Sequence, residues 1–269
     1  MGIVNVTPDS FYDGGRYHAL DAAVVHAREL IGQGADIIDI GGASSRPGAD
    51  AVPPEEEARR VVPVIEAVAG FFGGPISVDT TWTSVAKQAL EAGAHWINDI
   101  SAGRFDREMI SLVARSGCTI VLMHSRENPK TMQDAPRYDD VVADVARGLV
   151  ESVNNFKRGG VRDDQLLLDP GIGFAKTADH SIELIRGLDR IVGLGYPVVI
   201  GTSRKSFIGR ITGREAPERL YGTLGSVAAA YERGVSIFRV HDVAETADFL
   251  KVFIECTEYS RKGNDESSG

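Results

Sequence analysis

The sequence has few cysteines, no long apolar run and no excess of basic residues. Its 269 residues include only two cysteines, which is too few for a disulfide framework. No apolar stretch approaches the roughly 18 residues that a membrane-spanning helix needs. A formal net charge of −9 argues against the basic surface that nucleic acids or anionic membranes require. With strand-like residues instead of a secretory signal at its start, the chain is predicted to be cytoplasmic and to bind neither nucleic acid nor membrane.

Nucleotide-binding motifs are also missing. No G-x-G-x-x-G follows the first expected strand, no P-loop motif occurs, and the GIG at Gly171–Gly173 is too short for a dinucleotide fingerprint. What the chain does have is 43% apolar residues, 25% charged residues and 30 glycines, a composition typical of an α/β domain. A doubly wound sheet is therefore the weaker of the two α/β alternatives.

Short apolar runs alternate with amphipathic helical patterns along the whole chain. A glycine followed by a second residue, as in Gly34-Ala35 and Gly93-Ala94, precedes many of the apolar runs and can end the helix before it. The expected strands are Met1–Val6, Ala35–Ile40, Ile76–Asp79, His95–Ile100, Thr119–Met123, Gln165–Asp169, Pro197–Ile200 and Ser236–Val240. The expected helices are Leu20–Gln33, Pro54–Phe72, Thr83–Ala92, Asp106–Ser116, Asp139–Arg158, Ala178–Val192, Ser206–Thr212 with Pro217–Arg233, and Val243–Glu258. This order predicts a single (β/α)8 TIM barrel over residues 1–260, followed by a disordered tail at 261–269.

Polar or ionisable residues end nearly all of the expected strands. In a barrel the carboxyl ends of the strands surround one pocket, so these residues should meet there. They are Asn5, Asp39, Asp79, Asn98, His124, Asp169, the run Ser203–Lys205, Arg239 and His241. Asp39 is as well explained by orienting a neighbouring loop as by touching a ligand, and we leave it out of the predicted site.

This mixture of residues suggests a ligand with two chemically different parts. Asp79, Asn98 and Asp169 offer acceptors and an amide, which suit a flat heterocycle with N–H donors on one edge. Cations gather after the last two strands, the usual phosphate position in barrels. The residues suited to a phosphate or diphosphate are Lys205, Arg239, His241 and Arg46.

Seven motifs then become recognisable, in register from the first residue to the last helix. Together they resemble the dihydropteroate synthase family. The motifs are NVTPDSFYDGG at Asn5–Gly15, GGASSRPGA at Gly41–Ala49, NDISAG at Asn98–Gly103, MHSRENPKTMQ at Met123–Gln133, LDPGIGFAKT at Leu168–Thr177, SRKSFIG at Ser203–Gly209 and RVHDV at Arg239–Val243.

The resemblance implies condensation of 6-hydroxymethyl-7,8-dihydropterin diphosphate with p-aminobenzoate, after diphosphate leaves as the first step. It also implies site residues in four groups. The catalytic residues are Asp79, Asp169, Lys205 and Arg239, and the same four with Asn98 hold the pterin. The diphosphate residues are Asn5, which also binds Mg2+, with Arg46, Arg239 and His241. The p-aminobenzoate residues are Phe11, Ser45, Arg46, Pro47, Lys205 and Ser206.

The sequence departs from the commonest family pattern in its second loop and after His124. Ala43 and Ser45 stand where an acid and a threonine are usual, and Ser125 stands where methionine is frequent. Similar residues occur in sulfonamide-insensitive members of the family, so we hypothesise altered sulfonamide affinity. The family further implies a homodimer, for which Leu220–Tyr231 and the last helix are candidate surfaces.

Two other functions remain open at this point. A pterin-binding methyl-transfer domain would share the barrel and the Asp/Asn edge, but should lack the SRKSF and STRPG-like loops present here. A non-catalytic pterin-binding relative is the other alternative, and loss of Lys205 or Arg239 would have favoured it. Both residues are present, so the sequence favours the synthase.

Overall fold

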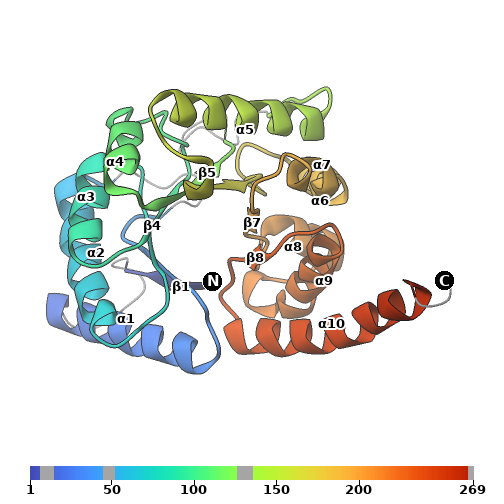
Figure 1. The fold of residues 1–269 in the computed structure, drawn as a ribbon. Helices are drawn as coiled ribbons and strands as arrows, with labels where there is room; N and C mark the ends of the chain where they lie inside the picture. Colours follow the sequence, from blue (N-terminus) through green and yellow to red (C-terminus); the bar gives the residue numbers. More distant parts are fainter. Residues whose placement is uncertain (7–14, 45–51, 126–135, 266–269) are drawn as a thin grey trace.

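A computed structural model of the protein describes residues 1–6, 15–44, 52–125 and 136–265. Within these residues, short parallel strands form the centre and helices surround them (Figure 1). The strands are β1 (Gly2–Asn5), β2 (Ile38–Gly41), β3 (Ile76–Asp79), β4 (Trp96–Asp99), β5 (Thr119–Met123), β6 (Leu166–Asp169), β7 (Val199–Ile200) and β8 (Ile237–Phe238). The helices are α1 (Gly15–Gly32), α2 (Pro54–Ala69), α3 (Thr83–Glu91), α4 (Glu108–Ser116), α5 (Val141–Arg158), α6 (Ala178–Arg186), α7 (Leu188–Val192), α8 (Ser206–Thr212), α9 (Leu220–Tyr231) and α10 (Val243–Asp265), with 3-10 turns η2 (Asp163–Gln165) and η3 (Ala216–Glu218).

The strands close into a barrel. Strands β1 to β6 pair in sequence order, and β7 pairs with β8. The two sheets are joined on one side where Leu168 bridges to Val198, and on the other where Gly2 bridges to Val240. The terminal amino group of Met1 adds to the second junction by donating to the Phe238 carbonyl at 3.0 Å. The predicted (β/α)8 barrel is therefore confirmed.

Alternation along the strands separates the interior of the barrel from its helix-covered outer face. In β6, for example, Leu166 and Leu168 pack in the large cluster with the helices, whereas Leu167 belongs to a smaller cluster inside the barrel. The members of this interior cluster are Met1, Ile37, Val121, Leu167 and Val199, with Trp96 and Ile237 packed against them. These apolar side chains fill the amino end of the interior. The polar side chains lie further along the strands, at the carboxyl end of the barrel.

The helices cover the outer face with apolar stripes. Helix α5 illustrates how local sequence and packing agree: the Asp140 carboxylate accepts a hydrogen bond from the Ala143 N–H at 2.8 Å and caps the helix. Its buried side chains recur every three or four residues, as in Val141, Val145 and Leu149. This stripe packs on the barrel, and the exposed face carries the charged residues.

Two helices differ from the sequence prediction. The helix expected over Ala178–Val192 divides into α6 and α7 at Gly187, whose φ of −102° and ψ of 19° are not helical. A β-carbon at this position would lie 2.7 Å from Val142 of the adjacent α5, so close packing requires glycine here, the residue least restricted to helical conformations. Helix α10, expected to end at Glu258, continues to Asp265 and takes in part of the segment predicted as a disordered tail. No proline lies between these positions to end the helix.

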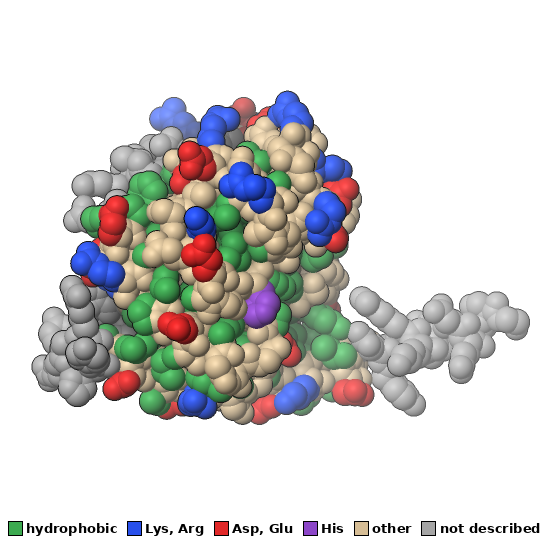
Figure 2. All heavy atoms as spheres, turned by 60° about the vertical axis from the view of Figure 1, so that its left-hand side comes forward, with side chains coloured by type: hydrophobic (Ala, Val, Ile, Leu, Met, Phe, Trp, Pro, Cys, Tyr) green, Lys and Arg blue, Asp and Glu red, His purple; other side chains and the backbone are tan. Residues whose placement is uncertain are grey.

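The surface is mixed in charge. On the face in Figure 2, acidic and basic side chains are interspersed and neither sign forms a broad patch. Among the residues that the structure describes, no helix is both long and apolar enough to cross a membrane. The cations that matter for ligand binding must therefore be sought locally, at the carboxyl end of the barrel.

Candidate active site

Most of the predicted site residues that the structure describes lie at the carboxyl ends of the strands. Asn5, Asp79 and Asp169 are the last residues of β1, β3 and β6, and Asn98 is the penultimate residue of β4. Arg239 follows β8 directly, so its side chain enters the same end of the barrel. The parallel pairing of β3 with β4 places Asn98 directly beside Asp79.

Arg239 lies between two carboxylates. Its Nε donates to Asp39 Oδ2 at 2.6 Å, and its Nη2 donates to Asp79 Oδ2 at 2.8 Å. Burial works to lower the pKa of Arg239, but the two carboxylates outweigh it and the net change is a raised pKa. Burial raises the pKa of Asp79, and the guanidinium opposes this change. Arg239 therefore stays charged and contacts one oxygen of the Asp79 carboxylate.

Asn98 joins the same network through Asp39. Its Nδ2 donates to Asp39 Oδ2 at 3.3 Å, and both side chains are buried. The carboxamide nitrogen is thus directed toward Asp39, and the carboxamide oxygen is directed away from it. An acceptor oxygen on Asn98, together with the Asp79 and Asp169 carboxylates, suits a ligand edge that carries N–H donors.

Asp169 and Lys205 influence each other electrostatically within the site. The Asp169 Oδ1 accepts a hydrogen bond from the Gly171 N–H at 2.7 Å, and burial raises the pKa of this carboxyl group. Burial lowers the pKa of Lys205 to about 8, against the opposing attraction of Asp169. The Lys205 Nζ lies 4.2 Å from the centre of the Phe174 ring, a cation–π distance. The lysine consequently loses its proton more readily than an exposed lysine, and it is held over a planar ring.

The segment after β7 contacts the segment after β8 through two pairs of side chains. Ser203 Oγ lies 2.9 Å from His241 Nδ1 and accepts a hydrogen bond from the His241 backbone N–H at 3.2 Å. Arg204, at a left-handed φ of 57°, forms two hydrogen bonds with the Asp242 carboxylate. These links tie the loop after β7 to the loop after β8, the region where barrels commonly bind phosphate.

Several predicted residues have a different status. Phe11, Ser45, Arg46 and Pro47 lie outside the described residues. Ser206 is exposed at the start of α8, next to Lys205.

Asn5 is exposed at the end of β1, on the rim of the barrel. Among the described residues, no three His, Cys, Asp or Glu side chains cluster as a metal cage. One exposed carboxamide oxygen fits a Mg2+ ion that takes its other ligands from phosphate and water, which is a common arrangement for this ion.

Two buried residues, Asp39 and Lys176, contact the predicted site residues or the strand ends but were not among the predicted site residues. Asp39 was left out, yet it is fully buried and contacts both Arg239 and Asn98. Its position as a single acid within the apolar run of β2 was the available signal. Lys176 was not selected either; its buried Nζ lies 3.2 Å from His124 Nδ1 and donates to the His124 and Phe174 carbonyls. It ties the end of β5 to the loop that carries Phe174.

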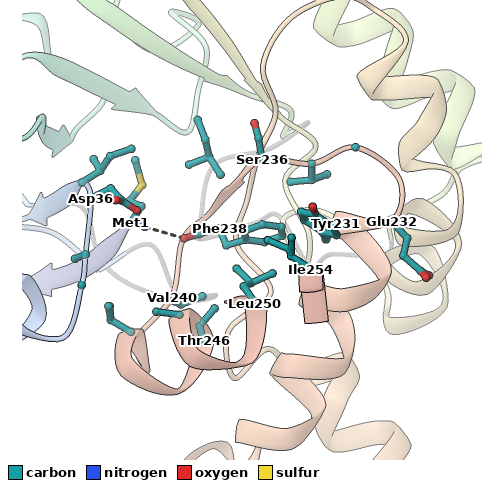
Figure 3. A pocket seen from close by; sticks show the side chains of 18 residues that line it. Met1, Asp36, Tyr231, Glu232, Ser236, Phe238, Val240, Thr246, Leu250 and Ile254 are labelled. Atoms are coloured by element: carbon teal, nitrogen blue, oxygen red, sulfur yellow. Dashed lines mark hydrogen bonds between the residues drawn. The ribbon is translucent and has the colours of Figure 1, made fainter. Parts of the chain in front are cut away.

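A cavity of about 610 Å³ lies at the opposite, amino end of the barrel, between the start of β8 and helix α10 (Figure 3). Its lining includes Met1, Phe238 and Leu250, with Asp36 and Glu232 at the edges. None of the predicted site residues lines this cavity. Function in this fold is concentrated at the carboxyl end, so the two ends are distinct in role.

Comparisons with known proteins agree with this geometry. A family profile described as pterin binding enzyme matches residues 1–241. The dihydropteroate synthase of Bacillus subtilis is 47% identical over 252 residues, covering 94% of this chain and 86% of the relative. That of Escherichia coli strain K12 is 45% identical over 257 residues, covering 96% and 90%.

Solved structures give the same result. A Xanthomonas albilineans dihydropteroate synthase with 4-aminobenzoic acid superposes with a TM-score of 0.90 at 46% identity, covering 95% of this chain and 91% of that one. The enzyme from the same organism in complex with 7,8-dihydropteroate gives 0.86 at 44% identity, covering 95% and 92%. With the strand-end acids, the amide and the cations in place, the chain belongs to the dihydropteroate synthases, within the family of pterin-binding enzymes.

Proposed function

We propose that the protein condenses 6-hydroxymethyl-7,8-dihydropterin diphosphate with p-aminobenzoate, giving 7,8-dihydropteroate and diphosphate. The observation that carries the proposal is the juxtaposition of Asp79, Arg239 and Asn98 around Asp39 at the carboxyl end of the barrel. In this arrangement Asp79 and Asn98 offer hydrogen-bond acceptors to the edge of a pterin, and Arg239 beside them offers a cation to the diphosphate. Family membership over nearly the whole chain supports the same reaction.

The reaction is a substitution at the methylene carbon of the pterin. The carbon–oxygen bond breaks, its electron pair leaves with the diphosphate, and a pterin cation remains. The arylamine nitrogen then donates its lone pair to the methylene carbon and loses a proton. When ionised, the carboxylates of Asp79 and of the buried Asp169 favour the cation electrostatically, because preorganised charges act strongly in a water-poor site.

Cations in the mouth of the barrel serve the leaving group and the ring. The Arg239 guanidinium contacts Asp79, and an incoming diphosphate would compete with Asp79 for it. Substrate binding therefore replaces the contact between Arg239 and Asp79 with contacts to the ligand. His241 and Arg46 are the other proposed diphosphate ligands. A Mg2+ ion held by Asn5 and by diphosphate oxygens would supply charge neutralisation for the leaving group.

The p-aminobenzoate site is proposed around Lys205 and Ser206. The Lys205 side chain lies over the Phe174 ring, so it is placed to border a planar ligand on its other side. The hydroxyl of Ser206 is exposed at the start of α8 and is accessible to a carboxylate. Phe11, Ser45 and Pro47 are proposed to complete this pocket from the first two loops.

Turnover of purified protein tests the proposal. Dihydropteroate should appear only when the pterin diphosphate, p-aminobenzoate and Mg2+ are all present, with one diphosphate for each product molecule. Diphosphate release without dihydropteroate, when p-aminobenzoate is present, would show that the second half-reaction is absent. Pterin binding with no product at all would favour a methyl-transfer domain or a non-catalytic pterin-binding protein.

We further propose that the enzyme is a cytoplasmic homodimer, assembled through α9 and α10. Tyr221 on α9 is 84% exposed and Val252 on α10 is 65% exposed, and the two helices pack against each other. Large exposed apolar side chains on neighbouring helices are typical of a covered surface. Sedimentation of the wild type and of Tyr221→Asp should show a dimer and a weakened dimer. A monomeric wild type would contradict the assembly.

A further inference from the structure

Asp39 lies at the centre of the polar network, although it was left out of the predicted site and the family resemblance assigned it no role. Its side chain is 0% exposed, and one oxygen, Oδ2, accepts both from Arg239 Nε at 2.6 Å and from Asn98 Nδ2 at 3.3 Å. The other oxygen, Oδ1, has no hydrogen-bond partner among the described residues. A buried carboxylate that makes these contacts on one side only must be held in place by them.

The two carboxylates that share Arg239 differ in access. The Asp79 side chain is 13% exposed, whereas the Asp39 side chain is inaccessible. A ligand that donates to Asp79 therefore competes with the Nη2 of Arg239, but it cannot reach the Nε contact with Asp39. Asp39 consequently remains the permanent counter-ion of Arg239, and Asp79 is the exchangeable one.

Asp39 also determines which atom of Asn98 is available to a ligand. A carboxylate only accepts hydrogen bonds, so it selects the nitrogen of the neighbouring carboxamide. With the nitrogen bound to Asp39, the carboxamide oxygen is turned toward the rest of the site. Loss of this acceptor would allow the amide to rotate and present a donor to a ligand edge that itself carries donors.

We propose that Asp39 is a positioning residue for pterin recognition, because it anchors Arg239 by its Nε and orients the Asn98 amide by its Nδ2. This inference rests on the proposed function, since it concerns the same pterin site. Asp39 does not touch the ligand. It acts by fixing two groups that do, one on β8 and one on β4.

The test compares Asp39→Asn with Ser77→Ala. Ser77 pairs with Asp39 in register, is equally buried and has a hydroxyl without a partner among the described residues, so it is a matched interior control. In Asp39→Asn we expect kcat/KM for the pterin diphosphate to fall about a hundredfold, the scale expected when catalytic groups are misplaced. At saturating pterin diphosphate the KM for p-aminobenzoate should stay within about twofold, because Asp39 contacts none of the described residues proposed for that subsite. Ser77→Ala should change neither value.

Titration of 6-hydroxymethyl-7,8-dihydropterin without turnover separates this inference from the proposed function. If the wild type binds the pterin but makes no product, the proposed function fails, and the pterin affinities of the variants still decide the role of Asp39. Wild-type pterin affinity and turnover in Asp39→Asn would overturn the inference alone. A wild type that binds no pterin overturns both.

Asp39→Ser is the second variant, because it removes the charge with a smaller side chain and is less prone to steric misfolding. We expect the same selective loss of pterin affinity at an unchanged far-UV circular dichroism spectrum. Equal losses of affinity for pterin and for p-aminobenzoate, the latter measured at saturating pterin and diphosphate, would in either variant assign Asp39 to general stability and overturn the inference. Failure of both variants to fold would do so as well.

Discussion

Glu57, in the first turn of α2, should make the ligand-free protein less stable as the pH rises. It is one of three acids in the first turn of α2, a position that the helix dipole favours for acids, but its side chain is buried at 2% exposure. Its Oε1 has no hydrogen-bond partner among the described residues. Burial raises the pKa of Glu57 from 4.5 to about 7, and the Thr80 hydroxyl and Arg60 only partly oppose it.

The sign follows from the proton affinity of the two states. The folded protein holds the Glu57 proton up to about pH 7, whereas the unfolded chain releases it near the ordinary value of 4.5. The stability that the protonated form contributes is therefore fully present below pH 4.5 and is lost as the pH rises to 7. At about 1.4 kcal/mol for each pH unit, the loss amounts to up to about 3 kcal/mol.

Urea unfolding followed by circular dichroism, at pH 5 and at pH 8, measures this loss. Glu57→Gln cannot ionise, so the variant should lose up to about 3 kcal/mol less than the wild type between the two pH values. Glu56→Gln is the matched control, because Glu56 precedes it in the helix and its carboxylate pairs with Arg59 and Arg60. That variant should keep the wild-type slope. Parallel pH profiles for Glu57→Gln and the wild type would refute the reasoning.

Three further predictions concern the site. Lys205→Ala should abolish turnover at an unchanged circular dichroism spectrum, and near wild-type activity would contradict its role. Gly171→Ala should cost well over the roughly 1–2 kcal/mol of a left-handed alanine in urea unfolding, since its β-carbon would lie 2.1 Å from the His124 carbonyl oxygen. Gly213→Ala, also left-handed but with open space, is its control and should cost only that amount. Sulfonamide inhibition should be weaker than in ordinary family members because of Ala43, Ser45 and Ser125, and low-micromolar sensitivity would exclude this effect.

Much of the fold follows from local sequence. Apolar strands ending in polar residues, with glycines before the next strand, predicted every β/α unit that the structure describes, because these signals lie within a few residues of one another. The division at Gly187 did not follow, since it depends on Val142 of a helix more than forty positions earlier. Close packing between distant segments leaves no periodic trace in the sequence.

In the site, too, the residues marked by local sequence were predictable and their long-range contacts were not. Strand-end position was enough to select Asp79, Asn98, Asp169 and Arg239, and the described residues bring them to one end of the barrel. Their partners were not predictable, because Asp39 lies 200 positions from Arg239 and its contact exists only when β1 joins β8. The burial of Glu57 likewise depends on the packing of α2 against the barrel.

Calorimetric titration of p-aminobenzoate tests the central claim most directly, namely that both substrates bind in one mouth of the barrel. The experiment uses the wild-type protein with Mg2+, first alone and then with pterin and diphosphate together. We expect p-aminobenzoate to bind only when pterin and diphosphate are both present. Binding of pterin with no binding of p-aminobenzoate under any of these conditions would contradict the synthase mechanism.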